Sequence, residues 1–318
     1  MLKIFEYFST SLPSGVFRKI MVNVGATVIP MIFAIIAMPV LVKILGVERF
    51  GLLAISWVVL GYLGILDFGV GRSLTQRISA KIGEGDVDTV KDVVWKSVLT
   101  VGVFSFLLSF VLFFLHYFYD FAEYLNISEV IEPEAYNGLY FVIIAVPFVV
   151  VSNVLFGVLE GLQKFSKIAI IKAPTSSLLY LLPCIIGYSD QDLKTILAGL
   201  SFLRVFSCIV LAFIVFRELK ELPDQNANRE ELIQLLRFGG WLSLTNFISP
   251  LMVYMDRLYI SFHLSAAVVA YYTTPVDLLT KALVLPLSFI AVMFPSFAQS
   301  WNVEKRESIR QYVLSSKI

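Results

Sequence analysis

Eight long apolar stretches constrain this 318-residue chain more than any other feature of its sequence. Crossing the ~30 Å hydrocarbon core of a bilayer takes about 20 helical residues. Backbone groups in lipid must be hydrogen-bonded within their own segment, so we expect helices. The sequence predicts an all-α integral membrane protein with eight transmembrane helices and the start of a ninth, over residues 20–42, 52–70, 93–115, 138–160, 168–188, 195–216, 238–262 and 275–296.

The composition excludes several classes of protein. The mean hydropathy is +0.82 and 15% of residues are charged, against about 25% in soluble proteins. A net charge of +1 provides no overall field to attract nucleic acid. The sequence has two cysteines without a metal-binding spacing, two isolated histidines and no nucleotide-binding or hydrolase motif. These features favour a transporter over an enzyme. We therefore expect no catalytic residues, no metal and no cofactor.

Basic residues are distributed unevenly between the connections of the predicted helices. Nineteen of the 25 Lys and Arg lie before the first span, after the eighth, or in the connections 2–3, 4–5 and 6–7. The opposite connections carry four, and the connection between spans 3 and 4 has five acidic residues and no basic one. Because cytoplasmic loops are enriched in Lys and Arg, we predict a multi-pass membrane protein with a cytoplasmic N-terminus.

The layout of spans 1 and 2 recurs in spans 7 and 8, at a shift of 219 residues. Six spans separate the two copies, so both have the same orientation, as parallel repeats in transporters do. We therefore predict a cytoplasmic N-terminus (1–19), a six-helix N-lobe (20–216), a cytoplasmic linker (217–237) and a partial C-lobe (238–318). Because the second copy stops after two spans and part of a third, we expect a truncated form of a longer protein with four further spans.

A family resemblance is carried by two segments. Residues 41–86 contain an LG-x-x-x-FG turn followed by D-x-G-x-G and a basic helix rich in small residues, and residues 254–260 read YMDRLYI. These segments resemble the polysaccharide-unit (O-antigen or capsule, Wzx-type) flippases of the multidrug/oligosaccharidyl-lipid/polysaccharide exporter superfamily. The resemblance covers the whole chain in layout, except that spans 9 to 12 of the second lobe are missing.

The resemblance implies two six-helix lobes around a cavity that opens alternately to the cytoplasm and the periplasm. The implied substrate is an oligosaccharide linked to polyprenyl pyrophosphate, exported across the bacterial inner membrane for O-antigen, capsule or exopolysaccharide assembly. Other expected partners are membrane lipids and the polysaccharide polymerase machinery, and we expect a monomer. The alternatives are a cation-coupled multidrug exporter of the same superfamily and a fragment that does not transport. Span 1 has no acidic residue, which favours the flippase over the cation-coupled exporter.

Arg204 is the main candidate for substrate binding. It lies near the middle of the span 195–216, where a charge costs at least ~2.5–3.5 kcal/mol on insertion scales. Such a charge requires a hydrated cavity or a partner. We interpret Arg204 as a ligand for the pyrophosphate, which the guanidinium can bind with two parallel hydrogen bonds. The alternative is a structural pair with a carboxylate on another span.

The other candidates lie nearer the ends of the spans. Lys281 either binds substrate or forms an intrahelical pair with Asp277, four residues earlier. Asp277 is also a candidate for ion coupling. Asp67, Asp256 and Arg257 are candidates for gating, and for the last two the alternative is simple anchoring in the membrane. Arg72 and Arg77 follow Asp67 on the same helical extension and are candidates for binding the anionic lipid headgroup.

Overall fold

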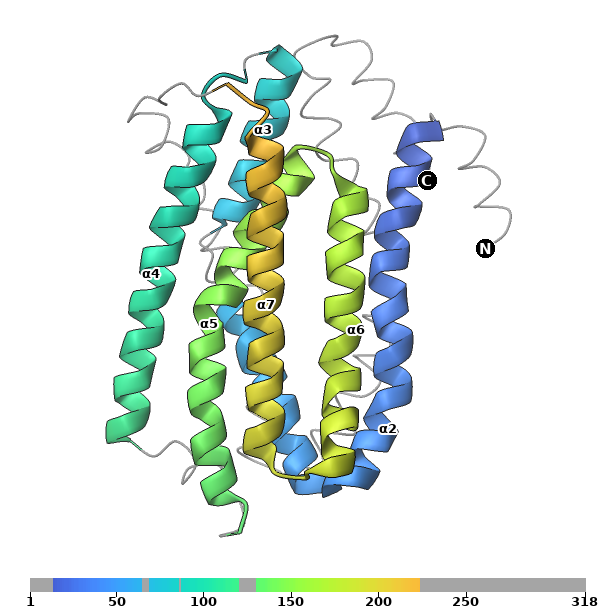
Figure 1. The fold of residues 1–318 in the computed structure, drawn as a ribbon, viewed down its shortest axis with the longest axis vertical. Coiled ribbons are helices and arrows are strands. Elements are labelled where there is room, and N and C mark those ends of the chain that lie inside the picture. Colours follow the sequence, from blue (N-terminus) through green and yellow to red (C-terminus); the bar gives the residue numbers. More distant parts are fainter. Residues whose placement is uncertain (1–13, 65–68, 86, 120–129, 224–318) are drawn as a thin grey trace, which may run out of the picture.

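The computed structural model describes residues 14–64, 69–85, 87–119 and 130–223, and these form a bundle of long helices (Figure 1). The described helices are α2 (Ser14–Gly64), α3 (Val70–Glu84), α4 (Val90–Phe118), α5 (Glu132–Gly161), α6 (Phe165–Ser189) and α7 (Leu193–Leu219). Five segments are long and apolar enough to cross a membrane: Val24–Gly46 of α2 and the whole of α4, α5, α6 and α7. They confirm five of the predicted spans. The spans 238–262 and 275–296 lie outside the described residues.

Two helical limbs make up α2, and they meet at Gly46. The backbone of this glycine has φ 77° and ψ 168°, a positive φ that residues with a Cβ rarely adopt. The second limb, residues 47–64, covers most of the predicted span 52–70. Gly69, in the left-handed conformation, then separates it from α3. Arg72 and Arg77 belong to this helix, which begins at Val70. Asp67, predicted to share a helical extension with them, lies outside the described residues.

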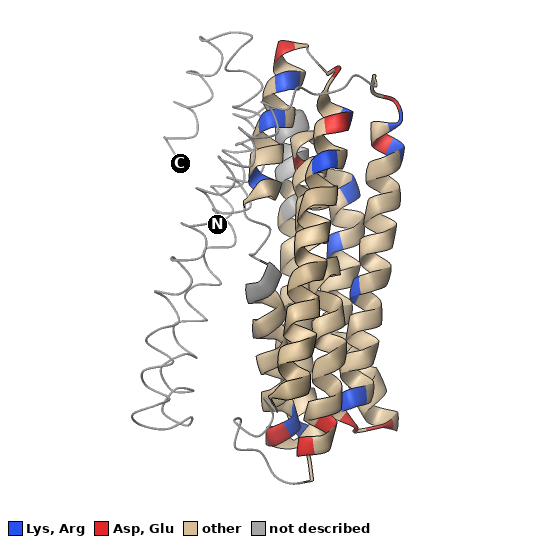
Figure 2. Cartoon of the chain, turned by 90° about the vertical axis from the view of Figure 1, so that its left-hand side faces the viewer, with Lys and Arg blue, Asp and Glu red and all other residues tan. Residues whose placement is uncertain are grey.

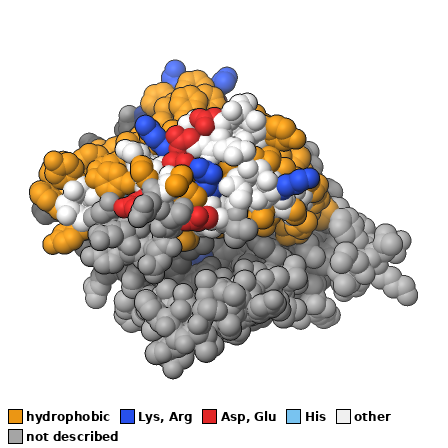
Figure 3. Space-filling model, turned by 90° about the horizontal axis from the view of Figure 1, so that it is seen from below, with side chains coloured by type: hydrophobic (Ala, Val, Ile, Leu, Met, Phe, Trp, Pro, Cys, Tyr) orange, Lys and Arg blue, Asp and Glu red, His pale blue; other side chains and the backbone are white. Residues whose placement is uncertain are grey.

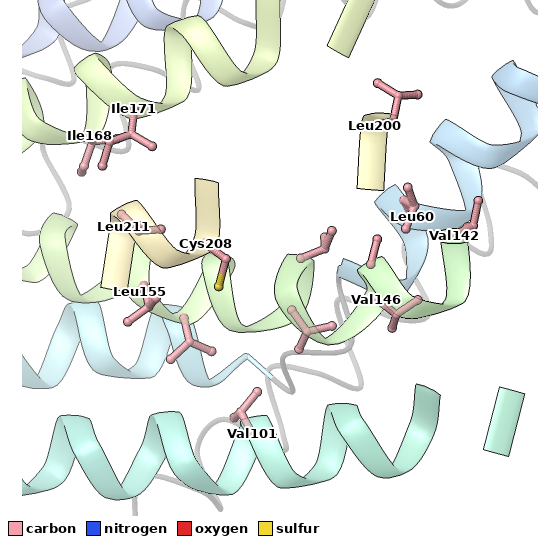
Figure 4. Close-up of a cluster of buried hydrophobic side chains, with 14 of the residues drawn as sticks. Leu60, Val101, Val142, Val146, Leu155, Ile168, Ile171, Leu200, Cys208 and Leu211 are labelled. Atoms are coloured by element: carbon pink, nitrogen blue, oxygen red, sulfur yellow. The ribbon is translucent and has the colours of Figure 1, made fainter. Parts of the chain in front are cut away.

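Helix α5 occupies the centre of the described bundle. It packs against α3, α4 and α7 and also touches α2 and α6. About two thirds of the residues in its most apolar stretch are buried, against about a tenth of those in the corresponding stretch of α4. Figure 4 shows the cluster built around it, in which Val142, Val146 and Leu155 of α5 lie near Leu200, Cys208 and Leu211 of α7. The phenylalanine-rich outer face of α4 is exposed, as expected of a helix that faces lipid.

A row of small residues lets α3 approach α5 closely. Gly157 of α5 lies directly against the backbone of Gly71, and a Cβ added to Gly157 would lie 2.3 Å from the Gly71 carbonyl oxygen. The Thr75 hydroxyl donates a hydrogen bond to the Gly157 carbonyl (2.9 Å), and the Ser79 hydroxyl donates one to the Gly161 carbonyl (3.1 Å). Small residues at four-residue spacing are typical of close helix pairs in membranes. This seam fixes α3 to the bundle.

At the end of the bundle where α2 reverses, an ion pair joins three helices. Arg49 donates two hydrogen bonds to Glu134, from Nε to Oε2 (2.8 Å) and from Nη2 to Oε1 (2.6 Å). Glu134 Oε2 also accepts a hydrogen bond from the backbone N–H of Leu193 (3.1 Å), at the start of α7. Seen from this end, acidic and basic side chains lie next to one another (Figure 3). We call this group, Arg49, Glu134 and the Leu193 amide, the outer clamp.

Replacing Glu134 with alanine should destabilise the folded protein by about 1.5–3 kcal/mol, the range for hydrogen bonds to charged groups. The substitution leaves Arg49 and the Leu193 amide without their shared acceptor. The midpoint of thermal unfolding in detergent measures the loss. A double variant, Arg49→Met with Glu134→Met, should recover part of the stability, because an apolar pair removes the unpaired charge. A melting midpoint unchanged in Glu134→Ala would contradict a stabilising role for the outer clamp.

The opposite end has its own ion pairs. Glu218, near the end of α7, accepts hydrogen bonds from Lys164 (3.0 Å) and Lys167, which lie around the start of α6. Figure 2 shows that the charged residues of the described helices lie mostly toward the two ends. The connections predicted to lie on one side of the membrane are thus brought together at one end of the bundle. As labels that follow the predicted orientation, we call the end with α3 and Glu218 the inner end and the end with the outer clamp the outer end.

Candidate substrate site in the membrane interior

Arg204 lies on the inward side of α7, between two buried neighbours. It follows the buried Ser201 by three residues and precedes the buried Cys208 by four, so the three share one helix face. It is eleven residues from Leu193 and fifteen from Leu219. At ~1.5 Å per residue, its Cα lies roughly 16 Å from the outer end of the helix. The guanidinium therefore starts deep in the apolar part of the bundle.

The guanidinium of Arg204 has no carboxylate partner in the described part of the chain. Its Nε is buried and finds no hydrogen-bond acceptor there, and the ion pairs found among residues 14–223 join other groups. A buried donor without an acceptor costs free energy, and a buried charge costs more. Among the described residues, the structure therefore offers no support for the alternative of a structural ion pair.

Tyr180 is the polar neighbour of Arg204, and it comes from α6. The Tyr180 phenol and the Arg204 guanidinium interact electrostatically. Pro183 follows Tyr180 by three residues, and Pro174 precedes it by six. A proline lacks the N–H that would bond to the carbonyl four residues earlier, so α6 is loosened on both sides of Tyr180. This helix can adjust its shape next to Arg204 more easily than an unbroken helix.

Trp57, on the second limb of α2, packs against Tyr180. The two rings meet edge to face, with centroids 5.1 Å apart and an angle of 69° between their planes. The Trp57 Nε1 atom is buried and has no hydrogen-bond partner among the described residues. A little toward the inner end, the hydroxyls of Thr175 and Ser207 lie 3.1 Å apart and connect α6 to α7. Helices α6 and α7 thus place polar side chains near Arg204, and Trp57 of α2 joins them through its contact with Tyr180.

Sequence reasoning missed Trp57 and Tyr180. An aromatic residue within an apolar span is normally a packing residue, and nothing in the local sequence distinguishes these two. The available signal was the distance of each residue from the outer end of its helix. Trp57 lies eleven residues after Gly46, Tyr180 nine residues before Ser189 and Arg204 eleven residues after Leu193. All three therefore lie at about the same level, roughly 14–16 Å from the outer helix ends at ~1.5 Å per residue.

The structure does not bring Arg72 and Arg77 into this cluster. Both lie on α3 at the inner end, where Arg72 is exposed and Arg77 is half-buried. Arg72 interacts electrostatically with Glu160, near the end of α5, and so does Lys172 of α6. The remaining predicted site residues lie outside the described residues: Asp67, Asp256, Arg257, Asp277 and Lys281.

The described residues also bear on metal and thiol chemistry. Within the described ranges, no group of three or more His, Cys, Asp or Glu side chains comes together as a metal site. Cys184 and Cys208 are both free, and Cys208 is buried. His116 is fully buried at the outer end, where its Nε2 lies 3.0 Å from the Tyr136 carbonyl and its ring packs against Tyr136 and Tyr140. This histidine serves as a packing group between α4 and α5.

Comparisons with known proteins agree on a family and a fold. The family model described as "polysaccharide biosynthesis protein" matches residues 16–301. A putative O-antigen transporter from Shigella flexneri is 31% identical over 275 residues, which are 86% of this chain and 64% of that protein. The chain therefore spans just under two thirds of this relative's length.

Solved structures show the same fold at lower identity. A MATE crystal structure matches with a TM-score of 0.78 and 17% identity over 95% of this chain and 69% of that one. A MOP-superfamily transporter from Pyrococcus furiosus matches with a TM-score of 0.77 and 17% identity over 95% of this chain and 68% of that one. The chain belongs to the polysaccharide biosynthesis protein family, and it has the fold of the MATE and MOP-superfamily transporters.

Proposed function

We propose that this protein moves an oligosaccharide linked to polyprenyl pyrophosphate from the inner to the outer leaflet of the bacterial cytoplasmic membrane. The single observation that carries the proposal is Arg204, a deeply placed guanidinium with no carboxylate partner among the described residues. A pyrophosphate would supply the missing negative charge and the missing acceptors. Arg is well suited to this role because its planar fork matches phosphate oxygens.

The family supports a polysaccharide substrate. The Shigella flexneri relative is named a putative O-antigen transporter, and O-antigen is a polysaccharide. We infer that the repeat unit is carried as a lipid-linked precursor, because an anionic headgroup explains a cationic site at mid-membrane better than a neutral sugar does. Alternating access between two lobes, with residues 20–216 as the first, follows from the resemblance and remains part of the proposal.

The multidrug MATE transporters share the fold, so a cation-coupled drug exporter is the second candidate. At 17% identity these neighbours indicate fold alone. The described first span, Val24–Gly46, contains no acidic residue that could bind a coupling cation. An interior Arg would repel a cationic drug. For the Pyrococcus furiosus transporter, a reversed polarity of the binding pocket is taken to suggest a different function, and a reversal of that kind would suit Arg204.

The function can be tested by complementation. A bacterial strain that lacks its own O-antigen flippase should regain surface O-antigen when it expresses this chain, and the surface polysaccharide can be measured with O-antigen antibodies. A strain that also lacks the lipid-linked precursor should gain none, which controls for nonspecific staining. If the chain inserts at normal levels and restores no polysaccharide of any tested repeat unit, this chain is not a flippase by itself.

The orientation is a separate prediction. In a Cys184→Ala/Cys208→Ala background, the variant Asp190→Cys should react from the periplasm with a membrane-impermeant maleimide, and Glu84→Cys should not. Both positions are exposed, at the outer and inner ends respectively. The reason is the excess of Lys and Arg at the inner end. Lysed cells, in which both variants must react, provide the control, and labelling of Glu84→Cys in intact cells would reverse the proposed direction of export.

A further inference from the structure

Trp57 has an unused hydrogen-bond donor next to the Arg204 site. Its indole Nε1 is buried and has no acceptor among the described residues, whereas buried donors in folded proteins are normally paired. Packing alone would be satisfied by phenylalanine, since the ring already contacts Phe50 (centroids 6.5 Å apart) and Tyr180 (5.1 Å). The nitrogen therefore needs an explanation beyond packing.

Two successive interactions, both involving Tyr180, link this donor to Arg204. Trp57 touches Tyr180, and Tyr180 interacts with Arg204. The three side chains come from α2, α6 and α7 and lie at similar depth. Indole N–H and guanidinium groups can only donate hydrogen bonds, never accept them. Trp57 Nε1 and Arg204 Nε are two buried donors without acceptors among the described residues, and both side chains neighbour the Tyr180 phenol. Together they match a ligand with several acceptor oxygens and no need of a donor.

We propose that the Trp57 indole N–H donates a hydrogen bond to the same phosphate oxyanion that the Arg204 guanidinium binds. This inference rests on the proposed function, and it adds a specificity-determining residue to that site. Tyr180 holds the indole edge-on, so that its orientation is fixed by packing. A phosphate group offers acceptors to both donors at once, while an amine or a quaternary cation would leave both donors unpaired and face an unfavourable charge.

The substitution Trp57→Phe tests the inference because it keeps an aromatic ring against Phe50 and Tyr180 and removes the N–H group. It also shortens the ring system, and the same loss occurs in the control variant Trp95→Phe. The full chain, purified and placed in lipid nanodiscs, is titrated with polyprenyl pyrophosphate and, for comparison, with uncharged polyprenol. Binding of the pyrophosphate should weaken about tenfold in Trp57→Phe, equivalent to about 1.4 kcal/mol. Binding of polyprenol should not change.

The matched control is Trp95→Phe. Trp95 lies on α4 with more than a third of its surface exposed and packs edge to face on Phe216, away from Arg204. Its pyrophosphate affinity should equal that of the parent protein. If Trp57→Phe binds as tightly as the parent while Arg204→Ala loses binding, the inference is wrong and the proposed function stands. If Arg204→Ala also binds normally, the proposed function falls with it.

A second measurement on the parent protein covers the case in which Trp57→Phe fails to fold. The chain has four tryptophans, so a ¹⁵N-indole spectrum contains four N–H signals, and the signal of Trp57 is assigned as the one left in a Trp95→Phe/Trp241→Phe/Trp301→Phe variant. Adding polyprenyl pyrophosphate should move this signal downfield, as a new hydrogen bond to an anionic oxygen does. A signal that stays in place at saturating pyrophosphate would overturn the inference.

Discussion

Replacing Arg204 with alanine is expected to abolish export of the lipid-linked oligosaccharide while the protein still inserts in the membrane. Losing a desolvated, hydrogen-bonded charge contact costs ~2–5 kcal/mol, which corresponds to a loss of affinity of roughly thirtyfold or more. Arg204→Lys should recover only part of the activity, because an ammonium group cannot provide the guanidinium's two parallel hydrogen bonds. Surface polysaccharide in the complementation strain measures the effect.

The control for this prediction lies on the same helix. Arg217 is an exposed residue in the last turn of α7, and Arg217→Ala removes the same charge at the inner end. This variant should keep near-normal export. Normal export by a well-expressed Arg204→Ala protein would contradict the site assignment. A drop in protein level before any change in export per molecule would instead indicate that Arg204 pairs with a carboxylate and supports folding.

A large effect on stability is expected from substitutions of Gly157. Alanine at this position would place its Cβ 2.3 Å from the Gly71 carbonyl oxygen, a distance that no real Cβ tolerates, and the obstacle is backbone rather than a flexible side chain. The helices α3 and α5 would have to separate, which also breaks the hydrogen bonds from Thr75 and Ser79. We expect Gly157→Ala to lower the free energy of unfolding by about 1–3 kcal/mol, and Gly157→Leu to prevent recovery of folded protein.

Gly102 provides the matched substitution. It also lies inside a membrane helix, α4, but an added Cβ would meet only the Val151 side chain at 3.9 Å, an ordinary contact. Alanine is the better helix former by about 1 kcal/mol, so Gly102→Ala should leave the unfolding midpoint unchanged or raise it. The two variants carry the same chemical change and should differ in sign. Equal melting midpoints for both would contradict the close approach of α3 and α5.

Long apolar segments were predictable from the sequence because one energetic cost dominates, that of leaving backbone groups without hydrogen bonds in lipid. A stretch such as residues 138–160 has a single solution in lipid, a helix, and the structure has α5 there. Positions along such a helix also follow from the sequence, which is why the depth of Arg204 was predicted correctly. The break at Gly69 was harder to predict, since a glycine is tolerated within a helix as well as at its end.

Contacts between distant segments were not predictable in the same way. Arg49 and Glu134 lie 85 positions apart, and each, read locally, is an ordinary residue at a membrane boundary. Pairing them requires knowing that α2 reverses beside the start of α5. The small residues Gly71, Gly157 and Gly161 did carry a readable signal in their spacing, although their partner helix could not be identified from spacing alone. The local sequence around Trp57 gave no signal, because its proposed role depends on the contact with Tyr180, 123 positions later.

The most direct test of the central claim measures translocation in proteoliposomes that contain only this protein. Polyprenyl-pyrophosphate-linked oligosaccharide with a fluorescent sugar is placed in one leaflet, and its arrival in the other is followed by a quencher that cannot cross the membrane. We predict movement with the parent protein, none with Arg204→Ala, and no competition from a cationic dye. Movement of the cationic dye in place of the oligosaccharide, or equal rates for the parent and Arg204→Ala, would contradict the account.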